Sequence, residues 1–154
     1  MATVEVTVTG VNDPLTAIAD LKTVQEDAVG RVRISVLAND RDADFGDIPT
    51  ILSLTTTGLR GSAVIDGSDI LYTPNHQYLR AGQSAIDRFS YRAVDGGGVQ
   101  SVATVTVTVI GANDPPRAVD NTVTLSEDAA ATTILVLAND TDVDLGDTKR
   151  VLTV

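Results

Sequence analysis

The acidic side chains of this chain recur in a fixed pattern. Residues 36–47 read VLANDRDADFGD, and residues 136–147 read VLANDTDVDLGD. Each copy places two aspartates two positions apart: Asp42 and Asp44, then Asp142 and Asp144. In an extended chain such side chains lie on the same side, where two carboxylates repel each other unless a cation lies between them. Calcium takes about six to eight oxygen ligands at flexible geometry, so the pattern predicts a calcium site in each copy.

Two other interpretations of the phrase are available. An EF-hand loop would begin at Asp40, but its glycine falls one position late, at Gly46, and Ile51 stands where the loop requires a glutamate. No helical periodicity flanks the phrase, so the EF-hand is disfavoured. The second interpretation is a solvated acidic turn in which Asp and Asn side chains cap backbone amides. A single copy does not distinguish this turn from a calcium site.

Composition restricts the possible functions. The chain has 154 residues, with 21 Asp and Glu against 11 Lys and Arg and a formal net charge of −10. This balance disfavours binding to nucleic acid and to anionic membrane surfaces. The chain has no cysteine and one histidine, His76, and no pattern pairs a nucleophile with a base. We therefore expect no catalytic residues and no thiolate zinc site. Since no apolar run reaches about 18 residues, we also expect no membrane insertion.

The acidic phrase belongs to a longer repeat. VTVTGVNDP ends at Pro14 and VTVIGANDP ends at Pro115, an offset of 101 residues. EDAVGRVRISVLAND, from Glu26, returns as EDAAATTILVLAND, from Glu127, with one residue lost. A period near one hundred residues indicates a repeated domain, because solenoid repeats have about 20–50 residues. We expect the last strand of a preceding repeat, a complete repeat, and the first strands of a following, truncated repeat, at 1–13, 14–115 and 116–154 respectively.

Between these boundaries the sequence alternates as β-strands do. TVEVTVTG (3–10) and TVTVTVIG (104–111) alternate with period two, and turn sequences such as DFGD, DGSD and DGGG separate the apolar stretches. Seven strands are expected, near 17–24, 31–37, 49–55, 62–66, 69–73, 86–94 and 100–110. Seven short strands in about one hundred residues are typical of an antiparallel Greek-key β-sandwich. We therefore predict an all-β fold of this immunoglobulin-like kind.

Four phrases, in order, resemble those of a known family. QEDAVGRV, ANDRDADFGD, AIDRFSYRAVDGGG and GANDPP resemble the Pro-Glu-Asn, Ala-Thr-Asp-Ala-Asp, Leu-Asp-Arg-Glu with Ala-x-Asp-Gly-Gly, and Asp-x-Asn-Asp-Asn-Pro-Pro phrases of cadherin repeats. In particular, the chain resembles the cadherin-like tandem repeats of large bacterial surface adhesins of the RTX and VCBS type. The resemblance covers essentially the whole chain. It implies a secreted or cell-surface protein whose repeats bind calcium at their junctions.

The resemblance also implies which residues bind the metal. In such repeats the ligands come from the base of one repeat, the linker and the top of the next. At the junction after the complete repeat they are Glu26, Asp87, Asn113 through its carbonyl, Asp114, Asp142 and Asp144. At the junction before it they are Asn12, Asp13, Asp42, Asp44 and Asp95. Two departures from the family, Phe89 and Gly111 in place of acidic residues, predict one or two ions per junction.

These observations predict a calcium-binding module that extends and rigidifies a long adhesin and supports cell adhesion. Its partners would be the neighbouring repeats of the same chain. The alternative is a carbohydrate- or protein-binding accessory module of a secreted multidomain protein. Exposed aromatic rings would favour that alternative, but the chain has only three Tyr and two Phe. Segments 1–13 and 116–154 would each expose a valine face and unpaired strand edges, so we also expect homotypic contact between molecules.

Overall fold

Two long strands, β6 (Ser84–Val94) and β7 (Gln100–Ile110), carry much of the core in the computed structural model, which describes residues 1–153. Buried and exposed positions alternate along both strands, because successive side chains point to opposite faces. Five shorter strands and one 3-10 turn complete the regular structure: β1 (Asp20–Gln25), β2 (Val32–Ile34), η1 (Val36–Ala38), β3 (Thr50–Thr55), β4 (Ser62–Asp66) and β5 (Asp69–Thr73). The predicted all-β sandwich of seven strands is confirmed.

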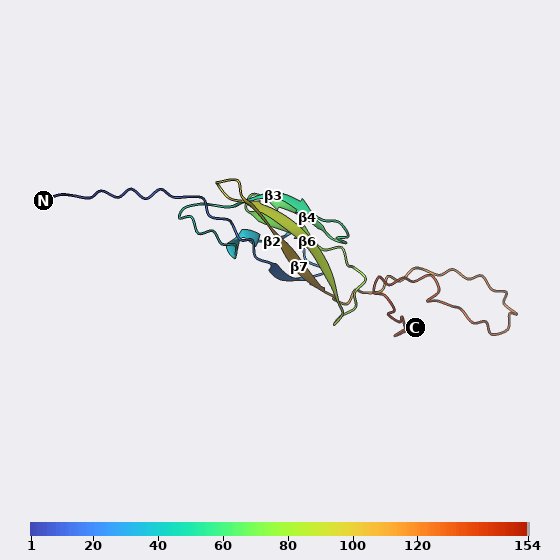
Figure 1. Cartoon of the computed structure of the whole chain (residues 1–154). Helices are drawn as coiled ribbons and strands as arrows, with labels where there is room; N and C mark the ends of the chain where they lie inside the picture. Colours follow the sequence, from blue (N-terminus) through green and yellow to red (C-terminus); the bar gives the residue numbers. More distant parts are fainter. Residues whose placement is uncertain (154) are drawn as a thin grey trace.

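The strands form two sheets (Figure 1). One has the order β1-β7-β6-β3 and the other the order β2-β5-β4. All pairs are antiparallel except one, because β1 runs parallel to β7 with Asp20 opposite Val105 and Gln25 opposite Ile110. The expectation of a wholly antiparallel sandwich is therefore wrong at this edge. After β1 the chain crosses to the other sheet, so β1 pairs with the last strand instead of forming a hairpin with β2.

Most strands fall close to their predicted positions. β4, β5 and β7 have the predicted bounds, and β1, β3 and β6 differ by one to three residues at an end. β2 is shorter than predicted, because η1 follows it and turns Val36 into the core. Residues 3–10, predicted as a strand, form none. Their counterpart, β7, is held between β1 and β6, and the described residues place no such strands beside 3–10.

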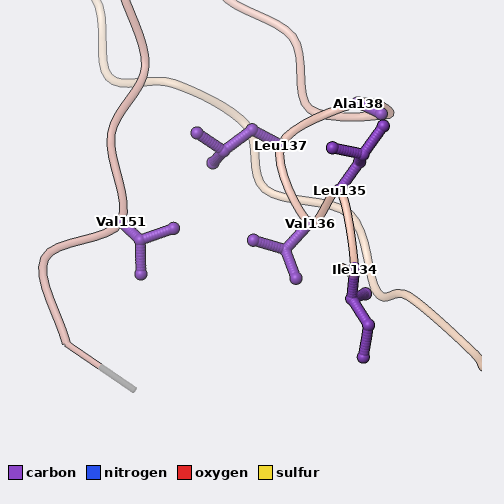
Figure 2. A pocket seen from close by; sticks show the side chains of 6 residues that line it. All are labelled: Ile134, Leu135, Val136, Leu137, Ala138 and Val151. Atoms are coloured by element: carbon purple, nitrogen blue, oxygen red, sulfur yellow. The ribbon is translucent and has the colours of Figure 1, made fainter. Parts of the chain in front are cut away.

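Residues 116–153, here called the C-terminal segment, also contain no strand. An open apolar cavity in this segment is lined by Ile134, Leu135, Val136, Leu137, Ala138 and Val151 (Figure 2). Ile134 is 44% exposed and Val136 is 39% exposed, whereas Ile34 and Val36, at the equivalent positions of the sandwich, are 5% and 0% exposed. The apolar face that is buried in the sandwich is therefore exposed in the C-terminal segment.

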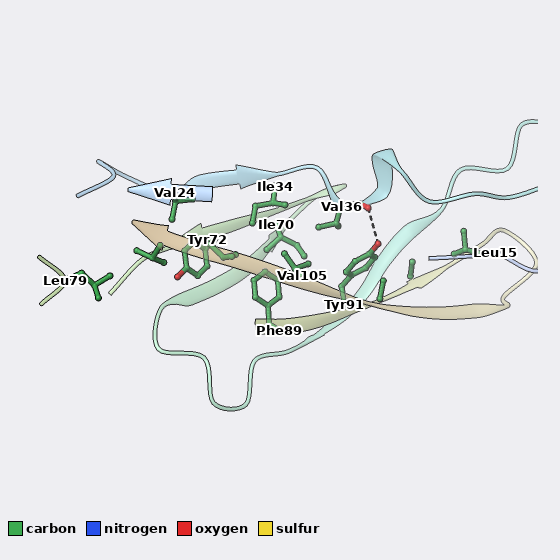
Figure 3. Packing of buried hydrophobic residues seen from close by; sticks show 14 residues of the cluster. Leu15, Val24, Ile34, Val36, Ile70, Tyr72, Leu79, Phe89, Tyr91 and Val105 are labelled. Carbon is green, nitrogen blue, oxygen red and sulfur yellow. Dashed lines mark hydrogen bonds between the residues drawn. The ribbon is translucent and has the colours of Figure 1, made fainter. Parts of the chain in front are cut away.

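The core lies between the two sheets (Figure 3). Val105 and Val107 of β7 and Ile70 and Tyr72 of β5 are fully buried. The rings of Tyr72 and Phe89 stack, with centroids 6.4 Å apart. Each such side chain contributes about 1.5–3 kcal/mol on burial, so the sandwich is stabilised without any disulfide.

Tyr91 of β6 fastens the start of the first acidic phrase to this core. Its hydroxyl lies 2.8 and 3.0 Å from the two carboxylate oxygens of Asp40 and 3.1 Å from the carbonyl oxygen of Val36 (Figure 3). Burial, together with the hydrogen bond to Asp40, raises the pKa of Tyr91 far above its ordinary value. Nearby, burial and the charge of Asp40 raise the pKa of Asp20 to about 6, and the buried Oδ2 of Asp20 has no hydrogen-bond partner in the part of the chain that the structure describes.

We predict that Asp20→Asn stabilises the sandwich at neutral pH. Because the folded state raises the pKa of Asp20 from 3.8 to about 6, its favourable contribution below pH 3.8 is lost as pH rises through about 6. Asparagine carries no charge at any of these pH values, so the variant avoids this loss of stability. Asn121, at the equivalent position of the C-terminal segment, donates to the carbonyls of Val119 and Val136 at 3.2 and 3.0 Å.

Urea unfolding at pH 7 measures this effect. The gain should be on the order of 1 kcal/mol, less than the full pKa shift implies because water screens this half-buried site. The gain should shrink at pH 4, where Asp20 is protonated in the folded state. A variant no more stable than the parent at pH 7 would contradict the unfavourable effect of burial and of the Asp40 charge on ionised Asp20.

We also predict weak head-to-tail association of this 154-residue chain. In the sandwich, Lys22 lies opposite Val107 and Val24 opposite Val109. When this register is shifted by the repeat offset of 101 residues, it predicts that Val123 pairs opposite Val6 and Leu125 opposite Val8. Segments 1–13 and 116–153 extend from opposite ends of the sandwich (Figure 1), so the pairing must join two molecules.

Sedimentation velocity across a concentration series tests the association. The average mass should rise with concentration for the whole chain and stay constant after removal of residues 1–11. Replacing Val6 and Val8 by aspartate should have the same effect as the truncation, because both side chains would face the apolar strand of the partner. A whole chain that stays monomeric at every concentration would disprove the pairing.

Candidate metal centres

The two acidic phrases end in loops of the same conformation, here called the first loop (Asp42–Asp47) and the second loop (Asp142–Asp147). The backbone N–H of Asp44 donates to the Asp42 carboxylate at 2.9 Å, and the second loop repeats this bond at 3.0 Å. Each loop then reverses at a glycine in the left-handed region, with φ of +87° at Gly46 and +84° at Gly146. The two carboxylates of each pair are thereby fixed relative to each other.

Hydrogen bonds before each loop also recur. The carboxylate of Asp40 accepts the N–H of Ile18 at 2.8 Å, and the second copy has the same bond at the same length between Asp140 and Val119. A β-bridge joins Thr16 to Arg41, and its counterpart joins Arg117 to Thr141. Each loop is therefore tied to the segment that follows its own linker.

The first linker (residues 10–15) and the second linker (residues 111–116) bring one further aspartate to each loop. The backbone N–H of Asp13 donates to Asp44 at 2.7 Å, and the N–H of Asp114 donates to Asp144 at 2.9 Å. In both linkers the preceding asparagine folds back onto the aspartate carbonyl, at 3.0 Å for Asn12 and 2.9 Å for Asn113. These contacts place the carboxylate-bearing residue of each linker beside its acidic pair.

Glu26, Asp114 and Asp144 converge where the sandwich meets the second linker. One carboxylate oxygen from each lies within 4.8 Å of the others, and we call these three residues the second acidic group. Glu26 and Asp144 are each only 2% exposed. The N–H of Leu79, at 3.2 Å, and that of Ala112, at 2.7 Å, orient the two oxygens of Glu26. The end of β1, the linker and the second loop therefore contribute one carboxylate each.

The second acidic group lacks partners for some of its oxygens. The buried Oδ2 of Asp114 and Oδ1 of Asp144 have no hydrogen-bond partner among the described residues. Burial, and then the negative charges of Asp27, Asp144 and Asp142, raise the pKa of Asp114. Buried carboxylates without partners are costly, so native proteins pair them or bind a metal with them. An all-oxygen set of this kind suits a hard divalent cation.

Asp42, Asp44 and Asp47 form the first acidic group, with carboxylate oxygens again within 4.8 Å of one another. The buried Oδ2 of Asp42 has no partner among the described residues. Asp47 is oriented by the N–H of Gly96, which lies 2.9 and 3.0 Å from its two oxygens. The first acidic group therefore resembles the second one, because each contains a buried carboxylate oxygen without a hydrogen-bond partner among the described residues.

Asp95 also lies at this end of the sandwich. It accepts the side-chain amide of Asn12 at 3.2 Å and the N–H of Val99 at 2.7 Å. Its burial alone would raise its pKa, but these hydrogen bonds outweigh burial and hold the pKa of Asp95 below its ordinary value. The predicted ligands Asn12, Asp13, Asp42, Asp44 and Asp95 are thus brought to one end of the molecule.

Asp87, predicted as a ligand of the second junction, has its hydrogen bonds inside the sandwich. Its Oδ2 accepts the hydroxyl of Tyr72 at 2.7 Å and the N–H of Gly61 at 2.8 Å. Its Oδ1 lies 3.4 Å from Nε2 of His76, which is as deeply buried. This carboxylate therefore organises the interior around Tyr72. Its assignment as a metal ligand stays a prediction.

Two positions explain why the second acidic group has few members. Phe89 is 4% exposed and stacks on Tyr72, so this position points into the core. A Cβ at Gly111 would lie 2.4 Å from the carbonyl oxygen of Arg80 and 2.7 Å from Cβ of Leu79. No side chain fits at Gly111, so the linker cannot contribute a carboxylate there.

Sequence reasoning missed Asp47 as a member of the first acidic group. The signal was present, because both phrases end in Gly-Asp, at Gly46–Asp47 and Gly146–Asp147. The glycine turn returns the chain so that the aspartate after it faces the Asp-x-Asp pair. In the first loop this aspartate joins the acidic group, whereas Asp147 of the second loop does not.

Comparison with protein-family models decides the family. The model of the bacterial cadherin-like domain matches residues 12–111, which include most of the first linker, the first loop and the strands β1 to β7. The chain belongs to this family. A search of curated proteins found no match to the chain.

The bacterial cadherin-like domain is typically a structural module of the adhesion type, without enzymatic activity, in a family that generally binds calcium. The resemblance to bacterial cadherin-like domains inferred from the sequence is thereby confirmed for residues 12–111. The two acidic groups provide the carboxylates that such a metal requires. A search for membrane spans among the described residues found no helix of sufficient length and apolar character.

We predict that Asp144→Ala weakens calcium binding at least tenfold, or by about 1.4 kcal/mol, because it removes a nearly buried carboxylate from the second acidic group. Without calcium the variant should melt at the parent temperature or slightly above it, since the repulsion between Asp144 and Asp114 is relieved. Isothermal titration calorimetry and thermal melting in excess chelator measure the two effects.

Asp128→Ala is the matched control, because it removes the same charge from an exposed turn of the C-terminal segment. Calcium affinity should be nearly unchanged in this variant. Equal affinities for Asp144→Ala and the parent would exclude Asp144 as a ligand.

Proposed function

We propose that this chain is a calcium-binding cadherin-like module that extends and rigidifies a long secreted or cell-surface adhesin and thereby supports cell adhesion. The observation that carries the proposal is the second acidic group. Its three carboxylates come from the sandwich, the linker and the second loop, and two of them have buried oxygens without a hydrogen-bond partner within residues 1–153. A cation bound there would add a direct link between three parts of the chain that are otherwise joined by hydrogen bonds such as Ala112 to Glu26 and Asp114 to Asp144.

The mechanical role follows from the position of Asp114 in the linker. The linker continues directly from β7, so it is the point about which the C-terminal segment would bend relative to the sandwich. With no cation, repulsion among Glu26, Asp114 and Asp144 favours separation of the three parts. With calcium, attraction to all three favours a single orientation. Calcium binding therefore changes the junction from a bending point into a stiff connection.

Calcium fits the site better than magnesium. The three carboxylates of the second acidic group are distant in sequence. Hydrogen bonds from backbone N–H groups fix their positions, and they do not come from one short loop that could impose octahedral geometry. Calcium accepts irregular sets of oxygens at about 2.3–2.6 Å, whereas magnesium requires near-ideal octahedral geometry and retains water. Sites of extracellular modules bind calcium with dissociation constants of about 10⁻⁴–10⁻³ M, which suits a secreted or cell-surface location.

The repeated phrases support a serial arrangement. The loop, bridge and linker hydrogen bonds of the first copy recur in the second copy with an offset of 100 or 101 residues. We infer from this recurrence that 1–13, 14–115 and 116–154 belong to three successive repeats of an adhesin of the RTX and VCBS type. The partners of each module are then the neighbouring repeats of the same chain.

The aromatic residues give no support to carbohydrate binding, the second candidate. Tyr72, Phe89 and Tyr91 are buried in the core. The ring of Tyr78 is covered by the guanidinium of Arg60, 4.4 Å from the ring centroid. Only Phe45 remains as a fully exposed ring, and a sugar platform normally needs more than one.

We predict that calcium raises the melting temperature and orders the linker at 111–116. At a hundredfold excess over the dissociation constant, linkage contributes about 2.7 kcal/mol. For a sandwich of this size this corresponds to a rise of roughly 10 °C. Differential scanning fluorimetry in chelator and in excess calcium measures the shift. Small-angle scattering should show a longer, less variable particle with calcium.

Magnesium at the same concentration is the control and should give a much smaller shift. The double variant Glu26→Gln and Asp114→Asn should abolish the calcium response, since it removes two of the three carboxylates. Equal melting temperatures in chelator and calcium for the parent chain would refute the proposed function.

A further inference from the structure

One segment of the sandwich, Tyr78–Arg80, contacts both the second acidic group and the second loop. The N–H of Leu79 donates to Glu26 at 3.2 Å. One residue earlier, the carbonyl of Tyr78 accepts the N–H of Leu145 at 3.0 Å. The segment therefore connects a carboxylate of the sandwich to the loop that carries Asp144, and no metal takes part in either bond.

Arg80 adds a positive charge to this connection. Its Nη1 donates to the carbonyl of Gly146 at 3.4 Å, and its Nε lies 3.5 Å from Oδ1 of Asp147. Its backbone is fixed by Gln83, whose side chain accepts the Arg80 N–H at 3.2 Å and whose N–H donates to the Arg80 carbonyl at 2.9 Å. A Cβ at Gly146 would lie 3.4 Å from the guanidinium, so the arginine lies against the turn itself.

The first loop has a different arrangement at the equivalent positions. Asp47 belongs to the first acidic group and is oriented by a backbone N–H of Gly96. Asp147, its counterpart, is paired with Arg80 and is not a member of the second acidic group. Asp147 is therefore held by a guanidinium, which comes from the sandwich that precedes the second loop.

The charge of Arg80 acts against the repulsion that would otherwise push the second loop away from the sandwich. Asp142, Asp144 and Asp147 all lie in this loop, and Glu26 and Asp114 face it. The side chains of Arg80 and Asp147 are 42% and 26% exposed, so water and salt weaken their attraction. The guanidinium fork nevertheless reaches a carboxylate and a carbonyl together, which an ammonium group does not reproduce.

We propose that Arg80 is a positioning residue that acts as a built-in cation at the second junction, where it holds the second loop on the sandwich before any metal binds. Asp144 is then already near Glu26 when calcium arrives. The claim that Arg80 prepares the second junction for calcium rests on the proposed function. The claim that Arg80 holds the second loop on the sandwich does not, because it depends only on contacts within the chain.

Amide hydrogen exchange of Leu145, in excess chelator, tests the proposal on the whole chain. The Leu145 N–H donates to Tyr78, so its protection reports how often the loop leaves the sandwich. Arg80→Met should lower this protection by about fivefold, the upper range for an exposed ion pair. Arg92→Met is the control, because Arg92 is an exposed arginine of β6 that donates to Gln100. The protection of the Leu145 N–H in Arg92→Met should equal that in the parent.

Two further measurements separate charge from packing. Raising the salt from about 0.05 to about 0.5 M should raise the protection of Leu145 in Arg80→Met, because salt screens the carboxylate repulsion that Arg80 no longer opposes. In the parent, salt screens the attraction to Arg80 as well, so the difference in protection between the two chains should narrow. Arg80→Lys should give intermediate protection, since it keeps the charge and loses the bond to Gly146. If calcium binds as proposed, it should restore protection in Arg80→Met, because the metal then holds Asp144.

The outcomes distinguish this inference from the proposed function. Equal protection of Leu145 in Arg80→Met and the parent in chelator would overturn the role of Arg80, whether or not calcium binds. A salt response that is the same in both chains would also overturn it. A parent chain that shows no calcium response, with a fivefold loss in Arg80→Met, would refute the calcium function and leave the fastening by Arg80 intact.

Discussion

The mutual repulsion of carboxylates that the fold brings together is the constraint on which the rest of this structure depends. Glu26 and Asp144 are almost completely buried, and Asp114 lies within 4.8 Å of both. Backbone N–H groups orient these side chains but do not neutralise them. Burial, and then the negative charges of Asp27, Asp144 and Asp142, raise the pKa of Asp114. A positive charge nearby lowers the free energy of such an arrangement, which accounts for both the proposed calcium and the position of Arg80.

The parallel pairing of β1 and β7 is what brings the second acidic group together. Gln25 lies opposite Ile110, and the N–H of Glu26 donates to the Ile110 carbonyl at 2.9 Å. Both strands therefore end at the same end of the sandwich, where Glu26 follows β1 and the linker follows β7. An antiparallel pair would have placed Glu26 and Asp114 at opposite ends. The first strand of the sandwich thus serves the junction as well as the core.

The sequence was sufficient for features that depend on local patterns. Alternating valines located β7, and the recurrence of Asp42 and Asp44 at Asp142 and Asp144 located the acidic loops. Features that depend on contacts between distant segments were not predictable in this way. The parallel edge of β1 is one example, and the pairing of Arg80 with Asp147 is another. Neither has a periodic signal, because each arises only when segments far apart in the chain pack together.

The loss of a linker carboxylate and the presence of an arginine at the second junction have a common structural origin. The backbone of Arg80 packs so closely on Gly111 that a Cβ there would lie 2.4 Å from the Arg80 carbonyl oxygen. The same close approach allows the Arg80 side chain to reach Gly146 and Asp147. One turn of backbone therefore excludes a side chain from the linker at Gly111 and supplies a positive charge beside the second loop.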